Sequence, residues 1–216
     1  MFLNDDIFNK LDDNEKKLIE RTITTGKFVK GQIINRSDKE CKGLMKIKKG
    51  IIRVYVVSDE GKEITLYRLS EGDYCILSAS CVLDAILFDV IIEAFEDTIV
   101  DILPSSSLNF LKKQNINFEN FLLKMTNERF SEVMWTLQSL LFLGLDQRLI
   151  NFLWDELIKN NCLELSYTHE EIAKLIGSSR EVVTRMLKHF NQEGIVFLKR
   201  GKIIIKDKNL LKNYVT

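Results

Sequence analysis

The sequence predicts an α+β fold in three parts: an N-terminal antiparallel β-roll of the jelly-roll type, a long helix, and a C-terminal winged helix-turn-helix. Three features of the 216-residue chain support this prediction. Short alternating runs with glycines between them fill residues 28–102, a coiled-coil-like apolar pattern follows, and two capped helical segments joined by a glycine lie near the C-terminus. We therefore expect three domains, at residues 1–115, 116–144 and 145–216.

The N-terminal part begins with an expected helix from Asp6 to about Thr24. Six short runs rich in apolar and β-branched residues follow: Ile33–Ile34, Leu44–Ile47, Ile51–Val57, Glu63–Leu69, Phe88–Ala94 and Thr98–Leu103. The segment Asp59-Glu60-Gly61 separates two of these runs and predicts a hairpin. Pro104, the only proline, marks the end of this part. Many short strands with regular turns indicate a small antiparallel barrel or jelly roll.

A long helix is expected from about Phe118 to Leu143. Its residues follow the spacing of a coiled-coil seam, at Leu123, Thr126, Phe130, Val133, Leu137, Leu140 and Gly144. Met134 and Leu141 form a second apolar edge, which we expect to lie against the β-roll. A single buried helix in a monomer would explain one apolar face, whereas two faces favour a parallel dimer. The expected dimer interface is Leu123, Phe130, Val133, Leu137 and Leu140.

Residues 168–190 predict two short helices joined by a glycine turn, which is the pattern of a helix-turn-helix. Thr168 and Glu171 form a capping box at the start of the first helix. Gly177 ends this helix, because glycine reaches the left-handed conformation of a tight turn at little steric cost. Ser178 or Ser179 then caps the second helix.

The second helix separates its apolar residues from its polar ones. A stripe to be buried consists of Val183, Met186, Leu187 and Phe190. The opposite strip carries two arginines, a glutamate and a threonine. In a major groove, arginine binds guanine O6 and N7 in a bidentate manner, and glutamate accepts from cytosine N4. The alternative is an ordinary surface helix with solvated charges, but the caps, the turn and the sorting of residues agree on DNA recognition.

The rest of the C-terminal part completes a winged domain. Gly144 is an expected hinge, and Asp146 an expected cap of the next helix. The core face of that helix is expected at Leu149, Ile150, Leu153, Leu157 and Ile158. Apolar runs at residues 193–198 and 202–205 flank Arg200-Gly201 and predict a two-stranded wing, whose basic tip would contact DNA phosphates.

The run Ser179-Arg180-Glu181-Val182-Val183-Thr184-Arg185 resembles the start of the recognition helix in the Crp–Fnr family of bacterial transcription regulators. The resemblance implies that the two arginines and the glutamate read base edges, while Thr168 and Ser179 contact phosphate. The expected base-reading residues are therefore Arg180, Glu181, Thr184 and Arg185, and the expected phosphate contacts are Thr168, His169, Ser178, Ser179, Lys188, Lys199, Arg200 and Lys202.

The resemblance extends over essentially the whole chain, since the β-roll is similar to the family's cyclic-nucleotide-binding-like sensor domain. It implies a homodimer on double-stranded DNA, and RNA polymerase is a further expected partner. A dimer would present two recognition helices to successive major grooves. The operator should then be a near-palindrome with half-sites about one helical turn apart.

The sensor part argues against cyclic AMP or cyclic GMP as the effector. Cyclic-nucleotide-binding members resemble one another in a cassette with an arginine that neutralises the phosphate. Here the corresponding segment is residues 72–83, and neither arginine nor lysine occurs between Arg68 and Lys112, a span that contains eight acidic residues. A buried phosphate without a paired cation is costly. The candidate effector pocket is Tyr74, Cys75, Ser78, Ser80 and Cys81.

Cys75 and Cys81 leave the cofactor open. The two cysteines have a functional interpretation, as a redox-sensitive pair or as thiolate ligands of a metal, cluster or haem. The alternative is that both are small buried hydrophobic residues. No metal site is expected, because a C-x5-C spacing is weak evidence for one, and the iron–sulfur members of the family resemble a different pattern nearer the N-terminus. Histidine occurs only at His169 and His189, both in the DNA-binding part.

Composition fits a regulator better than an enzyme. The net charge is +0, but residues 146–216 hold 12 basic and 9 acidic residues, against 19 and 22 in the rest. No apolar run is long enough to span a bilayer and no signal peptide begins the chain, so we expect a cytoplasmic location without membrane contact. We expect no catalytic residues, because residues 1–145 lack histidine and no nucleotide or zinc motif appears. A constitutive DNA-binding protein whose degenerate sensor only dimerises is the alternative to a regulator that responds to a small molecule or a redox signal.

Overall fold

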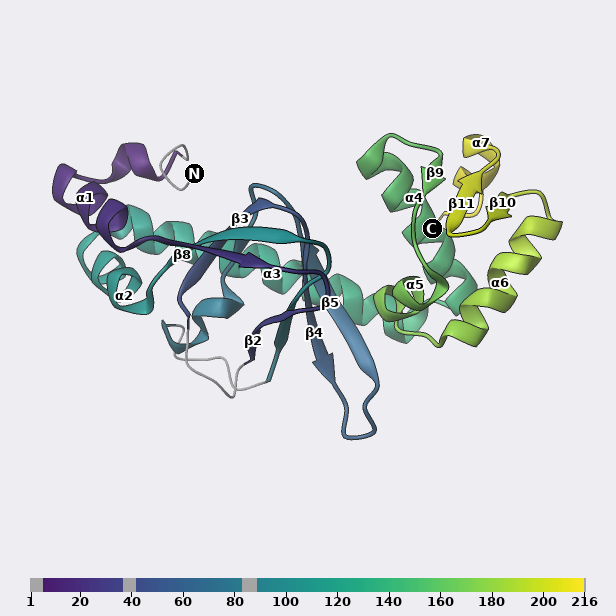
Figure 1. The fold of residues 1–216 in the computed structure, drawn as a ribbon, viewed down its shortest axis with the longest axis horizontal. Helices are drawn as coiled ribbons and strands as arrows, with labels where there is room; N and C mark the ends of the chain where they lie inside the picture. Colours follow the sequence, from purple (N-terminus) through teal and green to yellow (C-terminus); the bar gives the residue numbers. More distant parts are fainter. Residues whose placement is uncertain (1–5, 37–41, 83–88, 216) are drawn as a thin grey trace. The chain divides into compact units, whose positions relative to one another are not determined.

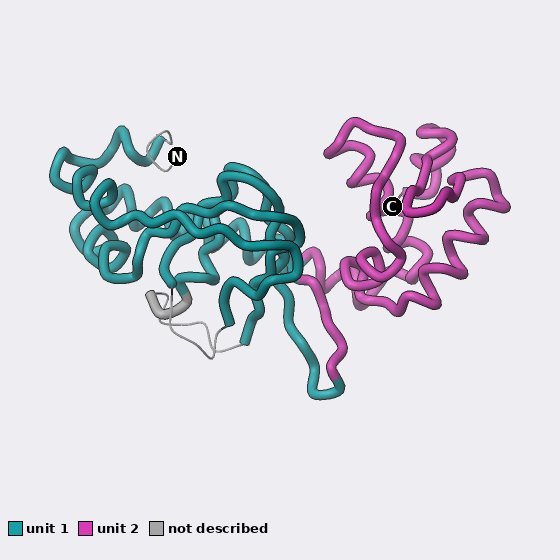
Figure 2. Tube along the Cα trace, in the orientation of Figure 1, with its two compact units in different colours: residues 1–60, 66–134 teal, residues 61–65, 135–216 magenta. Residues whose placement is uncertain are grey.

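The structure is a computed structural model that describes residues 6–36, 42–82 and 89–215, without the side chains of residues 80–82. The chain forms two compact units (Figure 2). The first contains residues 1–60 and 66–134, and the second contains residues 61–65 and 135–216. The long helix α3 (Ile116–Phe142) contributes to both units, and each unit is described by itself below.

The first unit contains two four-stranded sheets with the strand orders β1-β8-β3-β6 and β2-β7-β4-β5 (Figure 1). The strands are β1 (Thr24–Phe28), β2 (Ile33–Arg36), β3 (Leu44–Lys49), β4 (Ile52–Val57), β5 (Glu63–Leu69), β6 (Tyr74–Cys75), β7 (Ile91–Ala94) and β8 (Thr98–Leu103). Neighbouring strands whose register is known run antiparallel, as in Thr24 opposite Ile102. Side chains that alternate toward the core, such as Met45, Val54 and Ile92, are fully buried. The predicted β-roll is therefore confirmed.

Two helices, two short 3-10 segments and the start of α3 contribute to a second core in this unit. The elements are the 3-10 segments η2 (Phe8–Lys10) and η3 (Leu77–Val82) and the helices α1 (Asp13–Thr22) and α2 (Ser105–Gln114). The expected helix over residues 6–24 was too long at both ends. The Asp12 side chain accepts from Glu15 N at 2.8 Å and starts the helix at residue 13, while Ile23 is extended and leads into β1.

Helix α3 packs on the first unit with a different edge from the one expected. Leu122 and Met125 are buried there, and Val133 packs against the core between the sheets. Met134 is 39% exposed, so its expected packing against the β-roll is wrong; Leu141, which is 66% exposed, belongs to the second unit. The expected seam residues Leu123, Phe130 and Leu137 are also exposed, by 55%, 65% and 44%. Val133 differs from them, because it faces the interior of its own unit.

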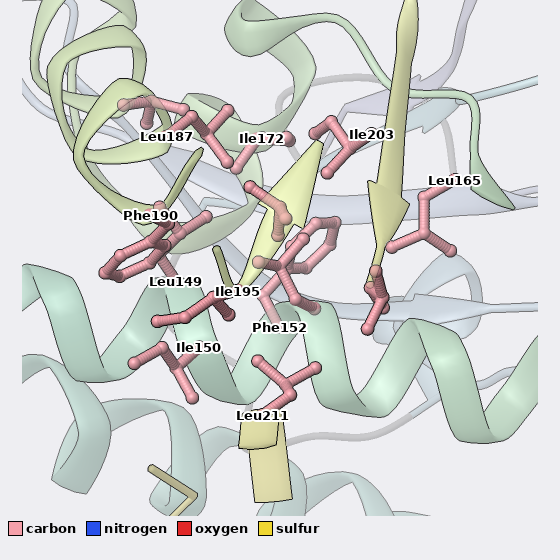
Figure 3. Packing of buried hydrophobic residues seen from close by; sticks show 14 of the residues in the cluster. Leu149, Ile150, Phe152, Leu165, Ile172, Leu187, Phe190, Ile195, Ile203 and Leu211 are labelled. Carbon is pink, nitrogen blue, oxygen red and sulfur yellow. The ribbon is translucent and has the colours of Figure 1, made fainter. Parts of the chain in front are cut away.

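The second unit has one core formed by four helices and a three-stranded sheet of order β10-β11-β9. The elements are α4 (Leu145–Asn160), β9 (Glu164–Leu165), α5 (His169–Ile176), α6 (Arg180–Gln192), β10 (Val196–Lys199), β11 (Lys202–Ile205) and α7 (Lys208–Lys212). Figure 3 shows Leu149 and Phe152 of α4 beside Ile172, Leu187 and Phe190 of the two short helices. This packing fixes α6 against the rest of the unit.

Two details of α4 differ from expectation. Gly144 is the N-cap residue, and Asp146 lies in the first turn without capping it. Ile158 is 51% exposed and does not belong to the core face, whereas Leu149, Leu153 and Leu157 do. None of the helices in the described residues is long and apolar enough to cross a membrane.

Candidate nucleic-acid interface

Helix α5 begins with a complete capping box. Thr168 Oγ1 accepts a hydrogen bond from Glu171 N at 3.1 Å, and a Glu171 carboxylate oxygen accepts from Thr168 N at 2.7 Å. Two backbone donors at the start of the helix are satisfied in this way, which fixes where the helix begins. The exposed Thr168 hydroxyl lies at the surface, where a phosphate contact stays a prediction.

The turn between α5 and α6 depends on Gly177. This residue ends α5 with φ 66° and ψ 48°, the left-handed conformation that favours glycine. Ser179 then caps α6, because its side chain accepts from Val182 N at 3.4 Å. The Ser178 hydroxyl is buried and has no hydrogen-bond partner among the described residues. Of the two serines proposed as caps, Ser179 is the one that acts, and the predicted phosphate contact of Ser178 would require its hydroxyl to turn outward.

Helix α6 sorts its residues as the sequence predicts. Val183, Leu187 and Phe190 are buried, and Met186 packs partly against the same core. The opposite side of the helix forms a shallow concavity lined by Arg180, Glu181, Thr184, Arg185, Lys188, His189 and Gln192. His189 and Gln192 were not among the contacts expected from the sequence. Both stand four residues after a predicted contact, so helical spacing would have found them.

The Thr184 hydroxyl is held by two neighbours. Thr184 Oγ1 donates to Arg180 O at 2.7 Å and lies 2.8 Å from His169 Nδ1. This contact joins α5 to α6. Base reading by Thr184 remains a prediction, but its hydroxyl already makes two hydrogen bonds within the protein.

The exposed face of α6 is positively charged around one carboxylate. Arg180, Arg185 and Lys188 line the same concavity as Glu181, and all four are exposed. Hydrogen bonds from the Glu181 backbone N–H and the Ser179 hydroxyl lower the pKa of Glu181, which keeps it an acceptor at neutral pH. Two fork-shaped donors and one acceptor on a helix face of this size match the edges of guanine and cytosine in a major groove.

The predicted wing is present as β10 and β11, with Lys199 opposite Lys202 across the Arg200-Gly201 turn. All three basic side chains are exposed. Lys202 Nζ forms an ion pair with the Glu164 carboxylate, and Lys199 Nζ lies 5.9 Å from the centre of the Phe197 ring. The wing therefore offers basic groups that can reach phosphates, one of them already paired.

The expected effector pocket lies in the first unit, and its described residues are used in packing. Tyr74 makes an edge-to-face contact with Phe121 at 5.2 Å. Ser78 Oγ lies 2.7 Å from Gly43 O and 2.6 Å from Cys75 O. Burial raises the pKa of the Cys75 thiol to about 11, so the thiol stays protonated at neutral pH. The side chains of Ser80 and Cys81, and the whole of Cys41, lie outside the described residues.

Two polar side-chain atoms near Cys75 are buried. The Tyr67 hydroxyl on β5 and Arg129 Nε on α3 make no hydrogen bond within the described residues. The Arg129 guanidinium lies 5.4 Å from the centre of the Tyr67 ring, and its Nη1 donates to Glu132 at 2.8 Å. Buried donors without partners in a native protein call for an explanation such as a water or a ligand. No group of three or more possible metal-binding side chains occurs within the described ranges.

Comparisons with known proteins agree with both halves of the chain. A family model described as a Crp-like helix-turn-helix domain matches residues 147–214, and one described as a cyclic nucleotide-binding domain matches residues 25–115. A solved structure from Eubacterium rectale ATCC 33656, described as a transcriptional regulator of the Crp/Fnr family, is 42% identical. The match covers 97% of this chain and 97% of that one, with a TM-score of 0.90.

Two more distant solved structures share the fold. FixK2 from Bradyrhizobium japonicum is 18% identical, with 90% of this chain and 98% of that one covered and a TM-score of 0.73. The c-di-GMP-responsive regulator CLP from Xanthomonas campestris is 16% identical, with 91% and 100% covered and a TM-score of 0.75. The comparison with curated proteins returns no match.

Proposed function

The chain belongs to the Crp–Fnr family of DNA-binding transcription regulators, and we propose that it acts as a cytoplasmic homodimer on a near-palindromic operator. The family is one of regulators and is non-enzymatic, which confirms the expectation that the chain is not an enzyme. In the proposed dimer, Arg180, Glu181 and Arg185 read bases while Thr168, Ser179 and the wing contact phosphates. RNA polymerase is a further proposed partner, for which the family is the only support.

The observation that carries this proposal is the arrangement of α6. Its apolar stripe is anchored in the core of the second unit, and its exposed face presents two arginines and an ionised glutamate. A dimer is supported by the exposed apolar side chains along α3, notably Leu123, Phe130 and Leu137. A surface of this kind, with the spacing of a coiled-coil seam, favours burial against a second copy.

We also propose that the first unit responds to a signal other than cyclic AMP or cyclic GMP. The buried Tyr67 hydroxyl and Arg129 Nε support a ligand that carries hydrogen-bond acceptors, since both groups are donors without partners among the described residues. The raised pKa of Cys75 makes it a poor redox sensor by itself. Calorimetry with each cyclic nucleotide tests the proposal, because micromolar binding of either would contradict it.

Selection of DNA by the purified protein tests the function as a whole. The full chain should enrich a consensus from a randomised duplex library, made of two inverted half-sites about one helical turn apart. An asymmetric consensus would contradict the proposed dimer, and the absence of enrichment would contradict sequence-specific binding. Comparing the affinity for the selected duplex after aerobic and anaerobic purification, with and without reductant, then separates a redox-responsive regulator from a constitutive one.

A further inference from the structure

The hydrogen bond between His169 and Thr184 determines which nitrogen of the imidazole carries the proton. Thr184 Oγ1 lies 2.7 Å from Arg180 O and 2.8 Å from His169 Nδ1. A carbonyl oxygen only accepts, so the single hydroxyl proton is donated to Arg180 O. The hydroxyl oxygen must then accept from His169, which means that Nδ1 of the neutral ring is protonated.

The other ring nitrogen, Nε2, therefore carries a lone pair when His169 is neutral. Within the described residues, Nε2 forms no hydrogen bond. It is also not buried, so it is open to solvent. A neutral His169 would face a DNA phosphate with an acceptor, and two acceptors repel each other. Phosphate binding at Nε2 requires a second proton on the ring.

Burial of His169 and the positive charges near it favour the neutral ring in the free protein. Burial is the largest cause that lowers the pKa of His169, and the positive charges of Arg180 and Lys188 on α6 lower it further. On α5 itself, the Glu171 carboxylate is used in capping Thr168.

Two other charged groups, Arg148 and Glu63, contact α5 near its opposite end. Arg148 Nη1 of α4 donates to Ile176 O at 2.7 Å, and Glu63 pairs with Lys174 at 3.9 Å. Bound DNA would place negative phosphates beside the two α6 cations and beside the ring. Both changes favour the protonated form of His169.

We propose that each subunit takes up one proton at His169 Nε2 when it binds duplex DNA. The ring then donates Nδ1–H to Thr184 and Nε2–H to a backbone phosphate. The proton comes from solvent, adds one positive charge, and breaks no covalent bond of the protein or the DNA. This inference rests on the proposed DNA-binding function and adds a proton as a ligand of the same interface.

The direction of the pH dependence follows from linkage. Because the complex holds more protons than its free components, affinity rises as the pH falls through the pKa of His169 in the complex. The affinity stops rising below the pKa of His169 in the free protein, because the ring is then already protonated before it binds DNA. Between the two values, the affinity changes by up to about tenfold per pH unit for each subunit.

The test measures affinity for the selected duplex by fluorescence anisotropy at constant ionic strength, from about pH 5.5 to pH 8.5. The wild-type protein should bind more tightly toward acid, and both His169→Gln and His169→Arg should lose this slope. The chain has two histidines, so His189→Gln is a matched control and should keep the slope whatever its own affinity. A thermal melt of each variant shows whether it is folded.

Thr184→Val distinguishes proton uptake at His169 from a phosphate contact made by the neutral ring. Valine removes the acceptor that holds the proton on Nδ1, so a neutral ring can move its proton to Nε2 and bind phosphate without proton uptake. The pH slope should therefore shrink although His169 is retained. An unchanged slope in Thr184→Val, or equal slopes in wild type and His169→Arg, overturns the inference and leaves DNA binding intact. Failure to select any duplex overturns the proposed function and this inference with it.

Discussion

Replacing Gly177 by alanine should lower the free energy of unfolding of the second unit by about 1–3 kcal/mol. Gly177 has φ 66°, a conformation that costs an L-residue roughly 1–2 kcal/mol. The added Cβ would also lie 3.0 Å from Leu140 Cδ2 and 3.4 Å from Arg148 Nη1. Since the nearer atom ends a flexible side chain, we expect the side chain to shift, at a cost of up to about 1 kcal/mol.

Gly194 provides a matched control for the backbone cost alone. It has φ 77°, and a Cβ built there meets nothing within 4 Å. Urea denaturation followed by tryptophan fluorescence suits this comparison, because both tryptophans, Trp135 and Trp154, lie in the second unit. Gly194→Ala should show only the conformational cost. Gly177→Ala should exceed it, and the excess should disappear when both glycine variants are compared in a Leu140→Ala background.

A wild-type unfolding midpoint for Gly177→Ala, with an unchanged dependence on denaturant, would refute this reasoning. It would mean that the turn between α5 and α6 does not require a left-handed residue. The backbone at residue 177 could then adopt other conformations, although the Gly177 N–H donates to Ala173 O at the end of α5.

Two other predictions concern the rest of the chain. Iodoacetamide should label the exposed Cys162 at about pH 8 but leave Cys75 unmodified in the folded protein, because burial raises the pKa of the Cys75 thiol to about 11 and keeps it protonated. Mass spectrometry of the digested protein measures the labelling of both cysteines. Rapid labelling of Cys75 would show that its thiol is accessible and would contradict the prediction. Phe130→Glu should convert the proposed dimer to a monomer in sedimentation equilibrium, because it places a charge in the expected seam at a side chain that is 65% exposed. Lys124→Glu on the same helix is the control and should leave the dimer intact. A dimeric Phe130→Glu protein would rule out this seam.

The helix-turn-helix could be predicted from sequence because local rules decide it. The Thr168–Glu171 box, Gly177 and the spacing of Val183 and Leu187 each depend on residues a few positions apart. The contact between His169 and Thr184 joins residues 15 positions apart, and no local pattern indicates it. Such contacts depend on how two helices pack, which a helical repeat does not specify.

Apolar periodicity identifies the apolar face of a helix but does not show how much of that face is covered by other elements. Met134 belongs to a regular apolar edge of α3 yet is exposed, and Ile158 continues the apolar face of α4 beyond the point where the core ends. The sequence predicts no strand at Thr24–Phe28 and extends the first helix to Thr24, because this segment has little apolar alternation. Its pairing with β8 defines it as the edge strand β1. Strand pairing between distant segments is the missing information in this case.

The span without cations between Arg68 and Lys112 is a single stretch of the chain. The fold brings cations from other elements to that stretch: Lys46 Nζ of β3 lies 5.2 Å from the Tyr74 ring, and Arg129 of α3 is close enough to Cys75 to lower its pKa slightly against the effect of burial. Charge near a pocket depends on the whole fold.

The most direct test of base reading by α6 is the affinity of Arg180→Ala and Arg185→Ala for the selected duplex and for duplexes altered at single half-site positions. Each variant should lose about 1–3 kcal/mol of discrimination at one position while retaining its preference elsewhere. If both variants kept the full preference of the wild-type protein, the exposed face of α6 would not be the surface that reads DNA.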